Sequence, residues 1–233
     1  VFAESRQHPV RMYEGIPLRW IELGPSDGFR GSARRGEFYV FQLAAWAARA
    51  PVEDVTLDFS ALRSAAGASI PASAIRCFNL GGKDWLGARF RKAVAIPKGQ
   101  VGTLWCGVEV PPDAAAGAYS GEVTFRARDS QPVRLRLSLD VETALAVDSG
   151  DDDSWRMSRL RWLDSTIGLD QTPTRPYTPL EVRGLAVACL GREVRFGALS
   201  LPESIRSNGR EILAAPVAFM VYDSPVAAPA RVV

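Results

Sequence analysis

The chain has 233 residues, enough to bury a substantial core, and its 47% hydrophobic and 23% charged residues exclude a disordered polypeptide. Its net charge is only +2, from 28 basic and 26 acidic residues, and the arginines alternate with apolar residues. That alternation is typical of a solvated face, so the sequence predicts no nucleic-acid partner.

Seven stretches in the first part of the chain alternate apolar and polar side chains, which is the period of a β-strand. In the last of them, Val133 to Val141, every second residue is aliphatic and the residues between them are polar or charged. Apart from a short turn near residues 58–65, no segment of useful length has a helical period. We therefore expect an all-β fold, an immunoglobulin-like antiparallel β-sandwich over residues 1–142. Its predicted strands are 18–23, 37–46, 52–59, 73–80, 102–110, 119–128 and 132–142.

The stretch "VPPDAAAGAYSGEVTF" at residues 110–125 connects two of these strands. Pro111 and Pro112 cannot continue a ladder, and Gly117 supplies the backbone freedom that a turn needs. Tyr119 then begins an alternating strand at a position where a tyrosine hydroxyl often bonds back to the chain, as in a tyrosine corner. This predicts a sheet-to-sheet connection rather than a ligand loop.

The three cysteines are an odd number without a CxxC pair, which argues against a disulfide framework and a zinc site. Cys106 shares the alternation of its strand, so we expect it to face the core as a small hydrophobic residue. A bridge between Cys77 and Cys106 stays open as an alternative.

An acidic segment with Gly and Ser predicts a linker at residues 143–154. Its three consecutive aspartates lack the spacing of a calcium loop, which favours a solvated linker over a metal site. We expect a second, smaller and incomplete β domain over 155–233, with an Asn208-Gly209 hairpin turn and a disordered tail at 223–233. A small meander leaves an open edge, so the sequence predicts that something outside this chain completes it. Its predicted strands lie within 180–190, 192–197, 203–207, 210–213 and 216–222.

Catalytic motifs are sparse. His8 is the only histidine, which argues against Ser-His-Asp, Cys-His and histidine-based metal sites, and no GxxxxGK[ST], GxGxxG or HExxH motif occurs. The glycine-spaced segment 23–36 resembles a phosphate loop only superficially. We therefore predict no cofactor, no metal and no catalytic residue in this chain.

Asp164 and Asp170 are the nearest approach to the paired carboxylates that glycoside hydrolysis requires. Trp155 and Trp162 flank them and are suited to stacking on sugar faces. We favour the alternative in which the tryptophans are core or interface residues and the aspartates cap turns. Trp85, in a Gly-rich loop, is expected to be more exposed than these two tryptophans. The candidates for carbohydrate or interface contact are Trp85, Trp155, Trp162 and Asp164.

The order of motifs along the chain resembles the N-terminal non-catalytic region of bacterial glycoside hydrolases related to family 123, whose named members are β-N-acetylgalactosaminidases. The resemblance covers most of residues 15–222 and implies a (β/α)₈ catalytic barrel after the β domains, with an adjacent Asp-Glu pair. No Asp-Glu dipeptide occurs here, so no catalytic residue is carried over. The motifs are "IPASAIRCFNLGG", "LWCGVEVPPDAAAGAYSGEVTF", "SRLRWLDSTIGLD", "YTPLEVRG", "LGREVRFG" and "LPESIRSNGREIL".

We therefore expect an accessory region that packs against and orients a downstream catalytic domain of the same polypeptide, and that is not a glycosidase by itself. The alternative is an independent carbohydrate-binding module with an exposed aromatic platform. The resemblance implies export in a bacterium, to the periplasm or outside the cell. Residues 1–15 lack a signal-peptide pattern, and no apolar run approaches the ~20 residues of a membrane helix, so we expect no membrane partner.

Overall fold

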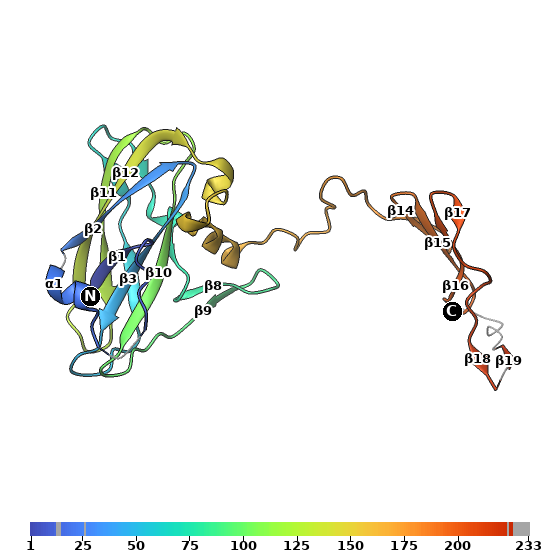
Figure 1. Cartoon of the computed structure of the whole chain (residues 1–233), viewed down its shortest axis with the longest axis horizontal. Coiled ribbons are helices and arrows are strands. Elements are labelled where there is room, and N and C mark those ends of the chain that lie inside the picture. The colour runs from blue at the N-terminus through green and yellow to red at the C-terminus, as the bar shows by residue number, and fades with distance from the viewer. Residues whose placement is uncertain (13–14, 26, 223, 226–233) are drawn as a thin grey trace. The chain divides into compact units, whose positions relative to one another are not determined.

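A computed structural model describes the chain except for residues 13–14, 26, 223 and 226–233 (Figure 1). As the sequence predicts, the fold is all-β, with an immunoglobulin-like antiparallel sandwich followed by a smaller β region. The chain divides into two compact units, which we call the first unit (Val1–Leu169) and the second unit (Asp170–Val233). Most of the tail predicted to be disordered, at 223–233, lies outside the described residues.

One sheet of the first unit has four strands in the order β1-β3-β10-β7. The two long central strands, β3 and β10, pair antiparallel along their whole length, with Val101 opposite Trp46 and Glu109 opposite Phe38. Both strands are buried at almost every position, because one face meets the other sheet and neighbouring segments cover the other. The bounds are β1 (Phe2–Ser5), β3 (Phe38–Trp46), β7 (Ile75–Cys77) and β10 (Val101–Glu109).

The second sheet of the first unit has the order β2-β12-β11-β5-β6, with β4 also pairing with β11. Its pairs are antiparallel except that β2 runs parallel to β12 at the sheet edge. The predicted alternation of the last strand is confirmed, since Leu135, Leu137, Leu139 and Val141 are buried. The bounds are β2 (Gly28–Arg35), β4 (Thr56–Phe59), β5 (Leu62–Ser64), β6 (Ser69–Ile70), β11 (Gly117–Arg126) and β12 (Val133–Leu145).

The core of the first unit lies between these two sheets. Residues from both form one contiguous buried cluster, including Leu43 and Leu104 from the first sheet and Val123 and Leu137 from the second. Cys106 belongs to this cluster and is completely buried, which confirms its predicted core position. This burial is what stabilises the sandwich, because each fully buried aliphatic side chain contributes about 1.5–3 kcal/mol.

The connection at residues 110–125 has the predicted tyrosine corner. The hydroxyl of Tyr119 donates a hydrogen bond to the carbonyl oxygen of Ala115 at 2.9 Å, and its ring is buried. Gly117 has a φ of +137°, which favours glycine over residues with a Cβ atom. The stretch is therefore a structural connection between strands.

Residues 18–23 form a helix, α1 (Leu18–Leu23), and the predicted strand there is wrong. Pro17 precedes the helix with a φ of −58°, and Gly24 ends it with a φ of +70°. Trp20 is buried and stacks on Phe2 with ring centroids 4.1 Å apart. In six residues, apolar side chains at 18, 20, 21 and 23 fit one helical turn as well as a strand, and the flanking Pro and Gly decide between them.

Strand β2 occupies much of the glycine-spaced segment 23–36, where the sequence predicted no strand. Only Phe29 and Ala33 are apolar in it, so it has no clear alternation. At Gly31 a Cβ atom would lie 2.1 Å from the Tyr39 hydroxyl, so the glycine allows the strand to approach that ring. The predicted strands at 52–59 and 73–80 are also shorter, because only 56–59 and 75–77 form ladders.

Residues 147–169 belong to the first unit, so the units divide later in the chain than the linker predicted at 143–154. Arg156 binds the buried carboxylate of Glu37 at 2.8 Å, and Arg6 binds the same carboxylate at 2.6 Å. This two-arginine pair attaches the segment to the sandwich. Its short 3₁₀ turns are η2 (Val147–Gly150), η3 (Ser154–Arg156) and η4 (Ser158–Asp164), and a further one, η1 (Ala72–Ala74), precedes β7.

The second unit contains one five-stranded antiparallel meander in the order β13-β14-β15-β16-β17. Asn208 and Gly209 have φ angles of +50° and +78° between β16 and β17, which confirms the predicted hairpin turn. The predicted strand at 216–222 is reduced to β18, which pairs with β19. The bounds are β13 (Glu181–Arg183), β14 (Ala186–Cys189), β15 (Arg192–Phe196), β16 (Pro202–Ser207), β17 (Arg210–Glu211), β18 (Met220–Val221) and β19 (Ser224–Pro225).

Candidate functional site

A hairpin of the first unit is formed by β8 (Gly81–Lys83) and β9 (Arg89–Arg91). It extends from the sandwich next to residues 147–169, which we call the 3₁₀ segment (Figure 1). Its turn is organised by Asp84, whose Oδ1 accepts hydrogen bonds from the amides of Leu86 and Ala88 at 2.9 and 2.8 Å. Trp85 and Leu86 stand at the tip and are 80% and 65% exposed. The sequence predicted this exposure of Trp85.

Asp164 joins the end of η4 to this hairpin. One carboxylate oxygen accepts a hydrogen bond from the Lys83 amide at 3.2 Å, and the other lies 3.5 Å from Nε of Arg76. A Cβ atom at position 82 would lie 2.6 Å from this carboxylate, so Gly82 permits the close approach. These contacts favour a positioning role for Asp164, because both of its oxygens are engaged by the protein.

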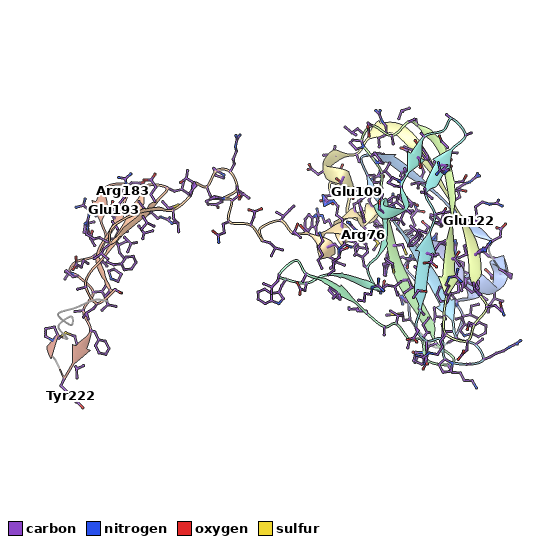
Figure 2. All side chains as sticks on the ribbon, turned by 180° about the vertical axis from the view of Figure 1, so that it is seen from behind. Arg76, Glu109, Glu122, Arg183, Glu193 and Tyr222 are labelled. Atoms are coloured by element: carbon purple, nitrogen blue, oxygen red, sulfur yellow. The ribbon has the colours of Figure 1, made fainter. Side chains whose placement is uncertain are left out.

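Around Asp164 lies a surface depression of about 640 Å³ that is rich in cations. Arg76 of the first unit (Figure 2) lines the depression, and its guanidinium lies over the ring of Phe38, 4.8 Å from the ring centroid. Among the described residues that line the depression, four are basic and one is acidic. They are Arg76, Lys83, Arg89, Arg91 and Asp164.

The other two candidate tryptophans lie on the 3₁₀ segment. Trp155 is 80% exposed, and its amide donates to Oδ1 of Asp153 at 3.1 Å, which fixes the start of η3. Trp162 is 55% exposed, with the guanidinium of Arg159 5.7 Å from the ring centroid. Trp155 is therefore largely open, as an interface or a ligand platform requires, whereas the guanidinium group of Arg161 also lies 5.9 Å from the Trp162 ring centroid.

Asp170 has a turn-capping contact within its own unit. It begins the second unit, whereas Asp164 belongs to the first, and its Oδ1 accepts a hydrogen bond from the Thr172 amide at 2.8 Å. The latter contact is the turn-capping role that the sequence favoured. Among the described residues, no group of three or more His, Cys, Asp or Glu side chains is placed to hold a metal ion. In the same part of the chain, no helix has the length and apolar character needed to cross a membrane.

A further candidate surface, which sequence reasoning about single residues missed, lies on the meander of the second unit. Directly opposed residues in neighbouring strands share one face of a sheet. Four aliphatic residues in successive strands are opposed in this way: Val182, Val187, Val194 and Ile205. The amide of Ile212 donates to the carbonyl oxygen of Ile205 at 2.8 Å, which places Ile212 next in the same row. These five aliphatic residues form a row across the whole sheet, which we call the aliphatic row.

The opposite face of the meander is charged, as the side chains of Arg183 and Glu193 show (Figure 2). Arg183 pairs with Glu181 at 2.6 Å, and Arg206 lies 3.7 Å from Glu211. Hydrogen bonds from the Ser204 hydroxyl and the Ile205 amide lower the pKa of Glu211 to about 2. The signal for this surface is the period-two alternation of residues 180–213 combined with the strand register.

The aliphatic row is exposed at its two ends, whereas its central residues Val187, Val194 and Ile205 are half-buried. Val182 and Ile212 are 68% and 60% exposed, and so are the neighbouring residues Leu180 and Leu185, at 67% and 61%. Among the described residues of this unit, Ala186 is the only hydrophobic residue that is fully buried. A sheet with one apolar and one charged face normally buries the apolar face against a second layer.

No protein-family model matches the chain, and no curated protein matches it. One similar solved structure is a family 123 glycoside hydrolase from Clostridium perfringens, with 18% identity and a TM-score of 0.49 over 61% of this chain and 27% of that one. Another is the fimbrial subunit MyfA from Yersinia enterocolitica, with 12% identity and a TM-score of 0.32 over 49% and 94% of the two chains. A third is the periplasmic chaperone SfaE, with 8% identity and a TM-score of 0.30 over 54% and 59%. The chain thus spans about a quarter of the hydrolase, and these are likenesses of β-sandwich fold.

Proposed function

We propose that this chain is a non-catalytic accessory β region of a bacterial glycoside hydrolase. In this proposal the second unit places its aliphatic row against a catalytic barrel of the same polypeptide, and the first unit is a rigid support beside it. The observation that carries the proposal is the exposure of the aliphatic row at its two ends, where Val182 and Ile212 are both more than half exposed. Burying such residues stabilises a contact by about 25 cal/mol per Å² of apolar area.

The order of sequence motifs supports the choice of a catalytic barrel as the occupant of this face. That order resembles the region that precedes the barrel in glycoside hydrolases related to family 123, and its most distinctive motifs lie between residues 158 and 213. Those residues include the strands that carry the aliphatic row. Bacterial origin and location in the periplasm or outside the cell belong to the same proposal.

The test compares this chain with a version extended into the reading frame that follows Val233. Val182→Lys places a charge in the aliphatic row, whereas Glu181→Lys changes the charge of the neighbouring residue on the opposite face. We expect Val182→Lys to lower the unfolding temperature of the extended protein by several degrees and Glu181→Lys to change it little. If Val182→Lys has no more effect than Glu181→Lys, the aliphatic row is not the contact surface.

A second candidate function is carbohydrate binding by the first unit. The observation that favours it is the 80% exposure of both Trp85 and Trp155, since a flat aromatic ring buries the C–H face of a sugar. Titration with N-acetylgalactosamine and with oligosaccharides to millimolar concentration, followed by tryptophan fluorescence, separates the two proposals. Binding that is lost in Trp85→Ala or Trp155→Ala would favour the platform, and an unchanged spectrum throughout would eliminate it.

A further inference from the structure

Two of the three cysteines face each other across neighbouring strands of the first unit. Cys77, at the end of the edge strand β7, lies directly opposite Cys106 in the central strand β10. Opposed residues point to the same side of a sheet, and here that side is the core, where Cys106 is fully buried and Cys77 is partly buried. The two thiols are therefore neighbours.

The backbone hydrogen bonds place this pair at a position where the strands approach closely. The amide of Phe78 donates to the carbonyl oxygen of Trp105 at 3.0 Å, and this bond joins the residue pair next to Cys77 and Cys106. Along an antiparallel ladder, hydrogen-bonded pairs of opposed residues alternate with non-hydrogen-bonded pairs. Phe78 and Trp105 are a hydrogen-bonded pair, so Cys77 and Cys106 next to them form a non-hydrogen-bonded pair, with Cα atoms typically about 4.5 Å apart. That separation lies inside the range of about 4.4–6.8 Å that a disulfide requires.

The surroundings of Cys77 favour its thiolate form. The Cys106 thiol donates a hydrogen bond to the carbonyl oxygen of Leu104 at 3.8 Å. Hydrogen bonding with the neighbouring Cys106 thiol and with the backbone at Asn79 and Leu80 favours the thiolate of Cys77. Together these bonds lower the pKa of Cys77, although burial opposes the shift. Burial raises the pKa of Cys106, so Cys77 is the nucleophile of the pair.

Cys77 is not fully enclosed, because the residue has intermediate exposure. It lines the cation-rich depression beside Arg76, Lys83 and Arg91. An anionic disulfide of low molecular weight, such as oxidised glutathione, is attracted to such a surface. Cys106 is reached only through Cys77, because its own side chain is completely buried.

We propose that Cys77 and Cys106 are a redox pair that forms an intramolecular disulfide by exchange with a low-molecular-weight disulfide. The Cys77 thiolate attacks one sulfur of oxidised glutathione, forming a mixed disulfide and releasing one glutathione thiolate, which takes a proton. Cys106 then attacks the sulfur of Cys77, and its proton passes to the departing second glutathione thiolate. Two protein thiols are oxidised and one glutathione disulfide is reduced to two thiols.

The bond would fasten the edge strand β7 to the centre of the sheet. The chain continues from Cys77 directly into the β8–β9 hairpin that carries Trp85, so oxidation restrains the base of that hairpin. The redox state thereby influences how firmly this exposed aromatic tip is held. This inference is independent of the occupant proposed for the aliphatic row.

The test uses the full 233-residue chain, reduced and then incubated with oxidised glutathione. Thiol counting after denaturation is expected to fall from three to one, and the intact mass to fall by two hydrogen atoms. After alkylation, trypsin should yield residues 77–83 joined to residues 99–126, whereas the peptide of residues 184–192 should carry an alkylated Cys189. Dithiothreitol should restore all three thiols.

Two variants serve as controls. Cys189→Ser should still lose two thiols, and Cys77→Ser should lose none, because its remaining core thiol is buried. A protein that keeps three thiols, one that stops at a glutathione adduct on Cys77, or one that dimerises through Cys189 would each overturn the proposal. Because the peptide map is read on the unsubstituted chain, a folding defect in a variant does not obscure the outcome.

Discussion

The two units use the same kind of strand but differ in what covers it. In the first unit the apolar faces of two sheets meet, and residues such as Leu43 and Leu137 are almost completely buried. In the second unit a single meander has an equally regular alternation, yet Val182 and Ile212 remain exposed. Alternation therefore predicts the strands of both units, whereas the presence of a second layer decides whether a core forms.

All six tryptophans lie in the first unit, so their fluorescence follows the unfolding of that unit and not of the second. The stability of the first unit can therefore be measured separately in the intact chain. The variants below are ordered by the loss of stability that they are expected to cause.

The largest effect is expected from Phe41→Ala in the core of the first unit. Phe41 is 1% exposed and stacks on Phe29, with ring centroids 5.3 Å apart. Its truncation should lower the free energy of unfolding by about 3–5 kcal/mol, measured by urea denaturation with tryptophan fluorescence. Phe196→Ala, in the second unit, should leave this transition unchanged. An equal shift in both variants would show that the units unfold as one cooperative body.

Glu37→Gln tests the attachment of residues 147–169 to the sandwich. The carboxylate of Glu37 is completely buried and binds both Arg6 and Arg156. Neutralising it leaves two largely buried guanidinium groups without a counter-charge, which should cost about 3 kcal/mol and speed tryptic cleavage after Arg159. Asp58→Asn removes an exposed ion pair with Arg126 and should cost less than about 0.5 kcal/mol. If the two variants lose the same stability and are cleaved at the same rate, the ion pairs of Glu37 do not hold residues 147–169 on the sandwich.

Tyr119→Phe removes the hydroxyl of the tyrosine corner without changing the ring. Loss of its bond to Ala115 leaves that carbonyl oxygen unpaired and should lower the free energy of unfolding by about 1 kcal/mol. Tyr177→Phe, at a 62% exposed site in the second unit, is the matched control with no expected change. Urea denaturation compares the two variants. An unaltered transition in Tyr119→Phe would show that the hydrogen bond of the tyrosine corner does not stabilise the first unit.

The smallest effect is expected from Asp164→Asn. This change weakens the contact with Arg76 but keeps an oxygen that can accept from the Lys83 amide, so the loss should be below about 1 kcal/mol. Asp170→Asn in the second unit should not change the tryptophan transition. In the extended protein, both variants should retain glycoside hydrolysis. Loss of turnover in Asp164→Asn at unchanged stability would instead make this residue catalytic.

The sequence predicts most of the sandwich because its main strands are long: β11 and β12 have a period of two, and β3 and β10 are rich in apolar residues. Strand β2 escaped prediction because its place depends on the gap that Gly31 leaves beside Tyr39, a contact that no local pattern encodes. Helix α1 was misread because six residues are too few to separate a helical period from a strand period.

The candidate surfaces divide in the same way. A Gly-rich loop predicted the exposure of Trp85, which is a local property. The contact of Asp164 with the hairpin joins residues 81 positions apart, and the aliphatic row requires the register of five strands. Such features depend on tertiary pairing, so they become visible only when the sheet register is known.

The central claim is that the second unit needs a covering layer that the 233-residue chain does not supply. Hydrogen exchange of the monomeric chain tests it most directly, because amide protection reports local stability. We predict that amides of β13–β17 exchange at least about a thousandfold faster than those of β3 and β10, and that they become protected when the proposed catalytic domain is attached. Equal protection of both units in the isolated monomer would contradict the claim.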